Sequence, residues 1–173
     1  ANVHVVTSSF KGLTSYENVN GIHVHRVKIL FRKSRDAATF ISMLSYLPAG
    51  FIRVLSLILK YKFDIINTHF VVPSGPLGYA ISKLFGIPNV LSLHGGDIYD
   101  PSKKLSPHRN RFFRAVVRFL LNRADVIVAQ SSNTRNNTIE YYAPKKEINI
   151  IPLAFHPPVI PKTSRKKLGL NER

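Results

Sequence analysis

The 173-residue chain has the length of one ordinary domain, and its 45% hydrophobic residues can fill a core, which excludes a wholly disordered protein. It has no cysteine, which excludes disulfide frameworks and thiolate metal sites and favours a reducing compartment. The formal net charge of +16 favours an anionic partner. This charge is concentrated in residues 101–173, with 15 basic and 4 acidic side chains, against 10 and 5 in residues 1–100.

The first third of the chain predicts two strands and one helix. Residues 3–7 form a β-branched run, and residues 22–30 alternate as a half-buried strand does. Residues 37–60 predict a helix, and Pro48 leaves open a break inside it. Polar residues interrupt the apolar stretch 37–59, so a soluble or peripheral protein is preferred to a membrane-spanning one.

The remaining chain alternates short apolar runs with longer helical patterns. The predicted strands are residues 64–68, 89–93, 126–129 and 148–151. The predicted helices are residues 74–85, 109–122 and 133–142. Strands separated by helices imply right-handed crossovers, so the expected fold class is α/β with a Rossmann-like, doubly wound parallel sheet. Ligands of such sheets bind beyond the carboxyl ends of the strands.

Several segments resemble, in order and spacing, the group 1 (family 4) glycosyltransferases of the GT-B fold. Residues 64–70 read DIINTHF and resemble the strand end D-[IV]-[IV]-H-x-H of that family. Residues 93–97 read LHGGD and resemble its H-G-x-D element. Residues 123–131 read RADVIVAQS and resemble its [KR]-A-D-x-[IV]-[IV]-x-x-S strand. The resemblance covers roughly residues 3–170.

This resemblance implies a division of the chain. Residues 1–156 would be the acceptor-side, N-terminal half of a GT-B fold, and residues 157–173 a Pro-rich basic linker toward a C-terminal donor-binding domain. A first strand and a glycine-rich turn of the family have no counterpart here. Without them, three outcomes are open: the strand at residues 3–7 pairs with another copy, it pairs directly beside residues 64–68, or the protein contains residues outside this sequence. The last is the expectation.

The activity implied by the resemblance is transfer of a sugar from a nucleotide-sugar to a hydroxyl acceptor, with retained anomeric configuration. The acceptor would be membrane-linked in one version of this hypothesis. The chain by itself is expected to be inactive, because the family holds the nucleotide-sugar mainly in the C-terminal domain. The alternative is a non-catalytic basic α/β module that binds nucleic acid or anionic phospholipid. No zinc-finger, homeodomain or RRM-like pattern supports nucleic acid.

His94 is the expected catalytic residue, because the matching histidine of the family faces the reacting sugar; it would orient donor sugar and acceptor. A histidine that only fixes its loop is the alternative. The expected substrate-binding residues also lie at strand ends and are Gly95, Gly96, Asp97, His69, Ser131 and Arg135. Structural interpretations remain open for five of them, and for Gly95 and Gly96 the interpretation is a permissive backbone rather than ligand selection. Asp97 fits a turn cap, Ser131 a helix N-cap and His69 a position in the core.

The helix at residues 109–122 is rich in arginine. Arg111, Arg114 and Arg118 share one face, and together with Lys103 and Lys104 they are expected to contact an anionic membrane. A solvated charged face is the alternative. The opposite face is expected to pack inward through apolar residues at helical spacing, namely Phe112, Val116, Phe119 and Leu120. The expected location is cytoplasmic, with peripheral contact to the inner face of the membrane left open.

His4, His23 and His25 lie close together in the predicted strands. A metal site would need converging ligands, usually with acidic or cysteine residues, and none accompany them. The sequence therefore implies neither a metal nor another cofactor.

Overall fold

The computed structural model describes residues 1–32, 39–102 and 106–154. The predicted linker at residues 157–173 and the predicted membrane contacts Lys103 and Lys104 lie outside these residues. The elements in chain order are β1 (Val3–Ser8), β2 (Tyr16–Val19), β3 (Ile22–Val27), α1 (Phe40–Ile58), β4 (Ile66–His69), α2 (Ser74–Phe85), β5 (Asn89–Leu93), η1 (Pro107–Arg109), α3 (Arg111–Arg123), β6 (Val126–Ala129), α4 (Ser132–Tyr142) and β7 (Ile148–Ile150).

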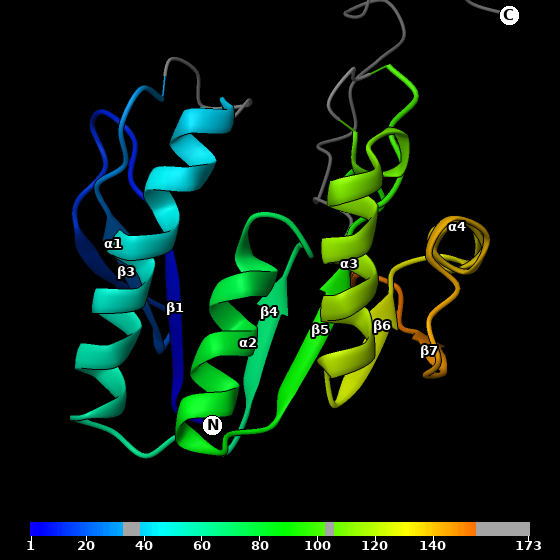
Figure 1. Ribbon diagram of the computed structural model, residues 1–173. Coiled ribbons are helices and arrows are strands. Elements are labelled where there is room, and N and C mark those ends of the chain that lie inside the picture. The colour runs from blue at the N-terminus through cyan, green and yellow to red at the C-terminus, as the bar shows by residue number, and fades with distance from the viewer. Residues whose placement is uncertain (33–38, 103–105, 155–173) are drawn as a thin grey trace, which may run out of the picture.

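The described strands form two sheets (Figure 1). One is three-stranded in the order β1-β3-β2, with β1 parallel and β2 antiparallel to β3. The other is four-stranded in the order β4-β5-β6-β7, and all of its pairings are parallel. The predicted α/β class with a parallel sheet is therefore confirmed.

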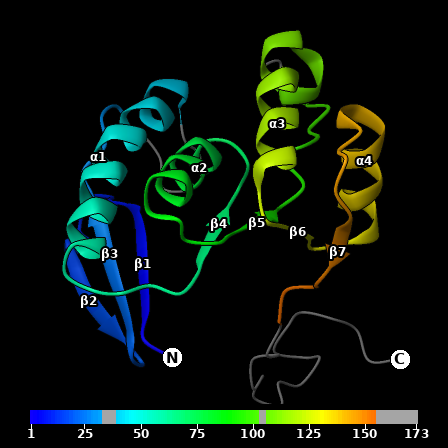
Figure 2. The same ribbon diagram turned by 60° about the horizontal axis from the view of Figure 1, so that its bottom comes forward.

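Strands β1 and β4 are not hydrogen-bonded to each other in the described structure. The interpretation that residues 3–7 pair directly beside residues 64–68 is therefore wrong. The physical reason is that α1 packs on β1 and β3 while α2 packs on β4 and β5, so the contact between the two helices sets the spacing of the sheets (Figure 2). That contact is close at Gly50, where an added Cβ would lie 2.9 Å from Cδ2 of Leu77.

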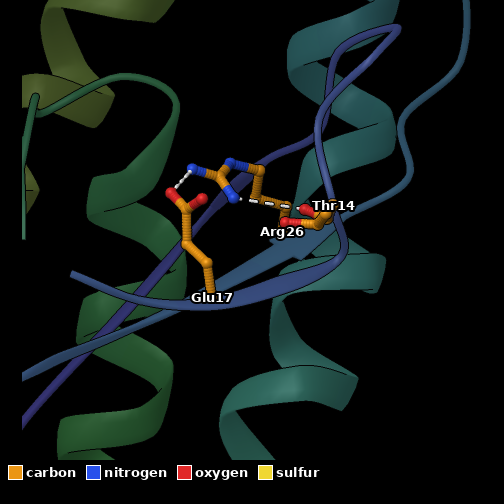
Figure 3. Close-up of polar contacts among 3 residues, drawn as sticks. All are labelled: Thr14, Glu17 and Arg26. Carbon is orange, nitrogen blue, oxygen red and sulfur yellow. Dashed lines mark hydrogen bonds and ion pairs between the residues drawn. The ribbon is translucent and has the colours of Figure 1, made fainter.

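The hairpin of β2 and β3 is an element that the strand prediction missed. Asn20 and Gly21 join the strands with φ of 51° and 86°, the left-handed backbone that an Asn-Gly hairpin turn requires. Arg26 on β3 forms an ion pair with Glu17 on β2, and its guanidinium also donates to the carbonyl oxygen of Thr14 at 3.2 Å (Figure 3). The Asn-Gly pair next to two β-rich runs is a signal that could have found this hairpin.

Helix α1 runs unbroken through Pro48. Thr39 caps its start by accepting a hydrogen bond from the amide of Ser42 at 3.2 Å. Pro48 lies on the exposed side of the helix, where water can satisfy the carbonyl group that proline leaves unpaired. The predicted end of α2 is confirmed, because Gly86 adopts φ of 65° at its C-cap.

The main core lies between the four-stranded sheet and its helices, and α3 enters it through Val117, Leu120 and Leu121. The predicted inward face is thus partly wrong, since Phe112 is 71% exposed and Phe119 44% exposed. The physical reason is that a second set of apolar residues follows the same helical spacing one position further along the chain. This second set packs into the core against the sheet.

Candidate functional site

Three polar side chains meet where neighbouring parallel strands end. His69 is the last residue of β4, His94 follows β5, and Gln130 follows β6. Nδ1 of His69 lies 2.8 Å from Nε2 of His94, and Nε2 of Gln130 lies 2.5 Å from Nδ1 and 3.1 Å from Nε2 of the same ring. The expected position of His94 and His69 at the carboxyl edge of the sheet is what the parallel register produces.

The surroundings of His94 favour the neutral imidazole. Partial burial lowers its pKa below the ordinary 6.5, and the neighbouring His69 lowers it further. The ring of Phe70 stacks on that of His94, with centroids 4.1 Å apart. A neutral imidazole has one donor and one acceptor nitrogen, and here Nε2 contacts His69 while Nδ1 contacts Gln130, so a sugar hydroxyl would replace one of these contacts.

Asp97 holds the loop that carries His94. Its Oδ1 accepts the amide hydrogen of His94 at 2.9 Å, and its Oδ2 accepts that of Val71 at 2.7 Å. The carboxyl group is buried, and this burial raises its pKa, although the backbone hydrogen bonds act in the opposite direction. These bonds tie the ends of β4 and β5 together; only the bond to His94 is local, as in a turn cap, and the role of Asp97 in acceptor binding stays a prediction.

The remaining predicted site residues lie on the same edge. Gly95 has φ of 89°, which a residue with a side chain rarely adopts, and an added Cβ on Gly96 would meet nothing within 4 Å. Ser131 is the N-cap of α4 and accepts the amide hydrogen of Thr134 at 3.2 Å. Arg135 lies one turn further along α4 and is half-buried. The N-cap interpretation of Ser131 accounts for its contacts, and substrate binding by both residues stays a prediction.

Gln130 is a site residue that the sequence prediction missed. It directly follows the predicted strand at residues 126–129, on the same edge as His94. Its place in the chain was therefore a usable signal, whereas its contact with His94 depends on the register of β5 and β6.

Two helices on the same side of the sheets carry unusual outer surfaces (Figures 1 and 2). On α3, the predicted membrane contacts Arg111, Arg114 and Arg118 are all exposed. On α1, large apolar side chains are more than half exposed, an observation the sequence prediction missed; these are Ile41 at 56%, Ile52 at 68% and, just beyond its end, Leu59 at 76%. Among the described residues, Ile41–Ile58 is long and apolar enough to cross a membrane by length and composition alone, and 17% of it is buried.

The rings of the three N-terminal histidines lie nearly parallel to one another. The ring of His4 lies 4.6 Å from that of His23 and 5.3 Å from that of His25, with interplanar angles of 20° and 8°. Nδ1 of His4 and Nε2 of His25 lie 3.0 Å apart and are hydrogen-bonded to each other, so the rings are not arranged around a common metal ion. Within the described ranges no group of three or more potential ligands could hold a metal ion.

A family model for Glycosyltransferase Family 4 matches residues 1–157. A curated relative, N-acetyl-alpha-D-glucosaminyl L-malate synthase of Bacillus anthracis, is 29% identical over 98 residues, which are 53% of this chain and 23% of that protein. The chain thus spans about a quarter of this relative.

Among solved structures, sucrose-phosphate synthase from Thermosynechococcus elongatus superposes with a TM-score of 0.73 at 16% identity, over 98% of this chain and 43% of that one. A second structure of that synthase gives a TM-score of 0.62 at 15% identity, over 88% of this chain and 76% of the other. These matches confirm the predicted fold, the N-terminal half of a GT-B architecture.

Proposed function

This chain belongs to glycosyltransferase family 4, and we propose that the protein containing it transfers a sugar from a nucleotide-sugar to a hydroxyl acceptor with retained anomeric configuration. The observation that carries the proposal is the hydrogen-bonded group of His69, His94 and Gln130 at the carboxyl edge of a parallel sheet. This is where α/β sheets bind their ligands.

Within this proposal His94 is the catalytic residue. Its neutral imidazole orients a sugar hydroxyl of the donor or of the acceptor, which contributes by positioning rather than by removing a proton. His69 and Gln130 hold the ring, and Asp97 holds the loop. Ser131 and Arg135, at the start of α4, are the proposed contacts for polar acceptor groups.

Product configuration tests the proposal. The intact protein is incubated with α-linked nucleotide-sugars, and the anomeric proton of the first-formed product is followed by NMR. We expect an α-linked product, because retention keeps the configuration of the donor. A β-linked product would contradict the retaining mechanism, while hydrolysis without transfer to any hydroxyl acceptor would contradict the proposed reaction.

The chain alone should bind acceptor without turning over donor. Transfer requires both substrates held in one geometry, and the family resemblance assigns the nucleotide-sugar mainly to a C-terminal domain. Purified residues 1–173 are therefore expected to release no labelled product from any nucleotide-sugar. Sustained transfer by this piece would contradict the assignment.

A second candidate function is binding to an anionic membrane surface. It is favoured by the exposed arginines of α3 together with the exposed apolar side chains of α1 on the same side of the sheets. Basic and apolar side chains on one side suit a helix layer that lies on a membrane. In this proposal the surface brings a membrane-linked acceptor to the edge of the sheet that carries His94. If the protein had no catalytic activity, the same surface would instead indicate a phospholipid-binding module.

A further inference from the structure

A second group of polar side chains lies at the other end of the fold from His94. It lines a cavity of about 420 Å³ between the three-stranded sheet and the last turns of α1, a volume within the roughly 300–1,000 Å³ typical of small-molecule sites. His4 lies at the amino end of β1, whereas His94 follows the carboxyl end of β5. Figure 1 places the start of the chain at the bottom of the view and the loops after β5 at the top.

A chain of hydrogen bonds fixes the tautomers of two histidines. Nη2 of Arg53 lies 3.0 Å from Nδ1 of His25, and an arginine can only donate, so this histidine nitrogen accepts. Nε2 of His25 must then carry the hydrogen, which it donates to Nδ1 of His4 at 3.0 Å. His4 therefore carries its own hydrogen on Nε2, and this buried nitrogen has no hydrogen-bond partner among the described residues. The chain ends in a donor that lacks an acceptor.

The charges around the cavity also favour an anionic ligand. Arg53 and Lys60 line it, and no carboxylate does. Neither cation forms an ion pair with a described acidic residue, while Glu17, on neighbouring β2, is paired with Arg26. Burial lowers the pKa of both His4 and His25, and the nearby cations and imidazoles lower it further, so both rings favour the neutral form. The site offers hydrogen-bond donors and positive charge to an anion.

The walls of the cavity are aromatic. Tyr61 contacts the ring of His4 with centroids 4.6 Å apart, and the hydroxyl group of Tyr16 lies 2.8 Å from Nδ1 of His23. Flat walls and hydroxyl groups suit a ligand larger than a bare ion, one that carries a ring. We propose that this cavity binds a small phosphate monoester, such as a sugar phosphate, with Arg53 and Lys60 contacting the phosphate.

This inference does not depend on the proposed function, because it concerns the opposite end of the fold. The test is an NMR titration of the imidazole resonances of the protein with glucose 6-phosphate, inorganic phosphate and glucose. We expect saturable shifts of His4 and His25 with glucose 6-phosphate, weaker binding of inorganic phosphate and no effect of glucose. Shifts with glucose equal to those with its phosphate would overturn the proposal, as would the absence of any saturable shift.

Two variants and a matched control decide which groups bind. Lys60→Gln removes an exposed charge, and Arg53→Gln keeps a donor for His25 but loses the charge. Each should weaken glucose 6-phosphate binding about ten-fold, as expected for the loss of one charge-assisted contact. Lys62→Gln changes a neighbouring lysine that does not line the cavity and should leave affinity unchanged. Equal weakening by all three would indicate non-specific attraction to a basic surface and overturn the site.

Discussion

At His94, burial and a neighbouring imidazole act on the ring in the same direction. Both lower its pKa below 6.5, so the folded protein favours the neutral form. A lowered pKa contributes stability that is present above pH 6.5 and is lost as the pH falls through the folded value. The acidic decline of transfer by the intact protein should therefore lie below pH 6.5. A decline centred above pH 6.5 in the kcat/KM profile would show that another group controls it.

Replacing Asp97 is expected to lower the stability of the folded protein, whatever its effect on the reaction. In Asp97→Asn, the side-chain amide has only one oxygen that can accept a hydrogen bond from the backbone N–H groups of Val71 and His94. The other N–H group then faces the side-chain NH₂ group, which is itself a donor. The free energy of unfolding should fall by about 1–3 kcal/mol in urea denaturation. The control is the exposed carboxylate of Asp64, whose Asp64→Asn change should cost less than about 0.5 kcal/mol. Equal losses in both variants would contradict the role of Asp97.

The sequence could identify His94 and His69 because strand ends in a parallel sheet are predictable from alternation of strands and helices. It could suggest a turn cap by Asp97 but not the second hydrogen bond of that carboxylate, since the amide of Val71 lies in the loop after β4. Only the register of β4 against β5 brings the amide of Val71 to a carboxylate 26 residues away. Local signals could predict the Ser131 N-cap, because that contact spans three residues.

Helix α2 packs on β4 with almost no space between them. An added Cβ at Gly78 would lie 2.0 Å from Oγ1 of Thr68, a side chain already hydrogen-bonded to Oδ1 of Asn89 at 2.7 Å. Gly78→Ala should destabilise the protein by about 1–3 kcal/mol, the usual cost of overpacking. Gly96→Ala meets nothing within 4 Å and should change stability by less than about 0.5 kcal/mol. Thermal unfolding of the two variants checks this, and equal melting temperatures would contradict it.

Helix α3 should bind anionic vesicles through its outer face. Replacing Arg111 and Arg118 by glutamine removes two exposed charges, each worth about 1 kcal/mol near an anionic surface, so binding should weaken about 30-fold. The control replaces Lys11 and Lys28, two exposed lysines outside this helix, by glutamine. Vesicle co-sedimentation measures both. If the two pairs weaken binding equally, net charge rather than α3 is responsible.

Element boundaries were largely predictable, because β-branched runs, Gly86 and the helical periodicity are local signals. The inward face of α3 was not, since two overlapping patterns compete and tertiary packing selects the one that contains Val117 and Leu121. The exposed apolar face of α1 was missed for a related reason. When only the sequence is known, a long apolar helix suggests a helix buried in the core. Helix α1 instead contacts the rest of the protein along one side only.

At the scale of the whole molecule, the described strands divide into a three-stranded and a four-stranded sheet. Crossover rules predict parallel pairing of successive strands, but they do not predict the separation of β1 from β4, because it depends on how α1 and α2 pack. The two proposed sites lie at opposite ends of the strands. His94 lies at the carboxyl ends of the strands, and the cavity beside His4 lies at the amino ends.

If His94 belongs to a glycosyl-transfer site, its removal should abolish most of the transfer activity. Transfer of labelled sugar from a panel of nucleotide-sugars to membrane-extract acceptors is compared between the intact wild-type protein and His94→Ala. The variant should lose about 100-fold or more in kcat, as expected when one positioned polar group is removed from a reacting centre, with an unchanged melting temperature. Transfer within two-fold of wild type by a fully folded His94→Ala protein would contradict the central claim.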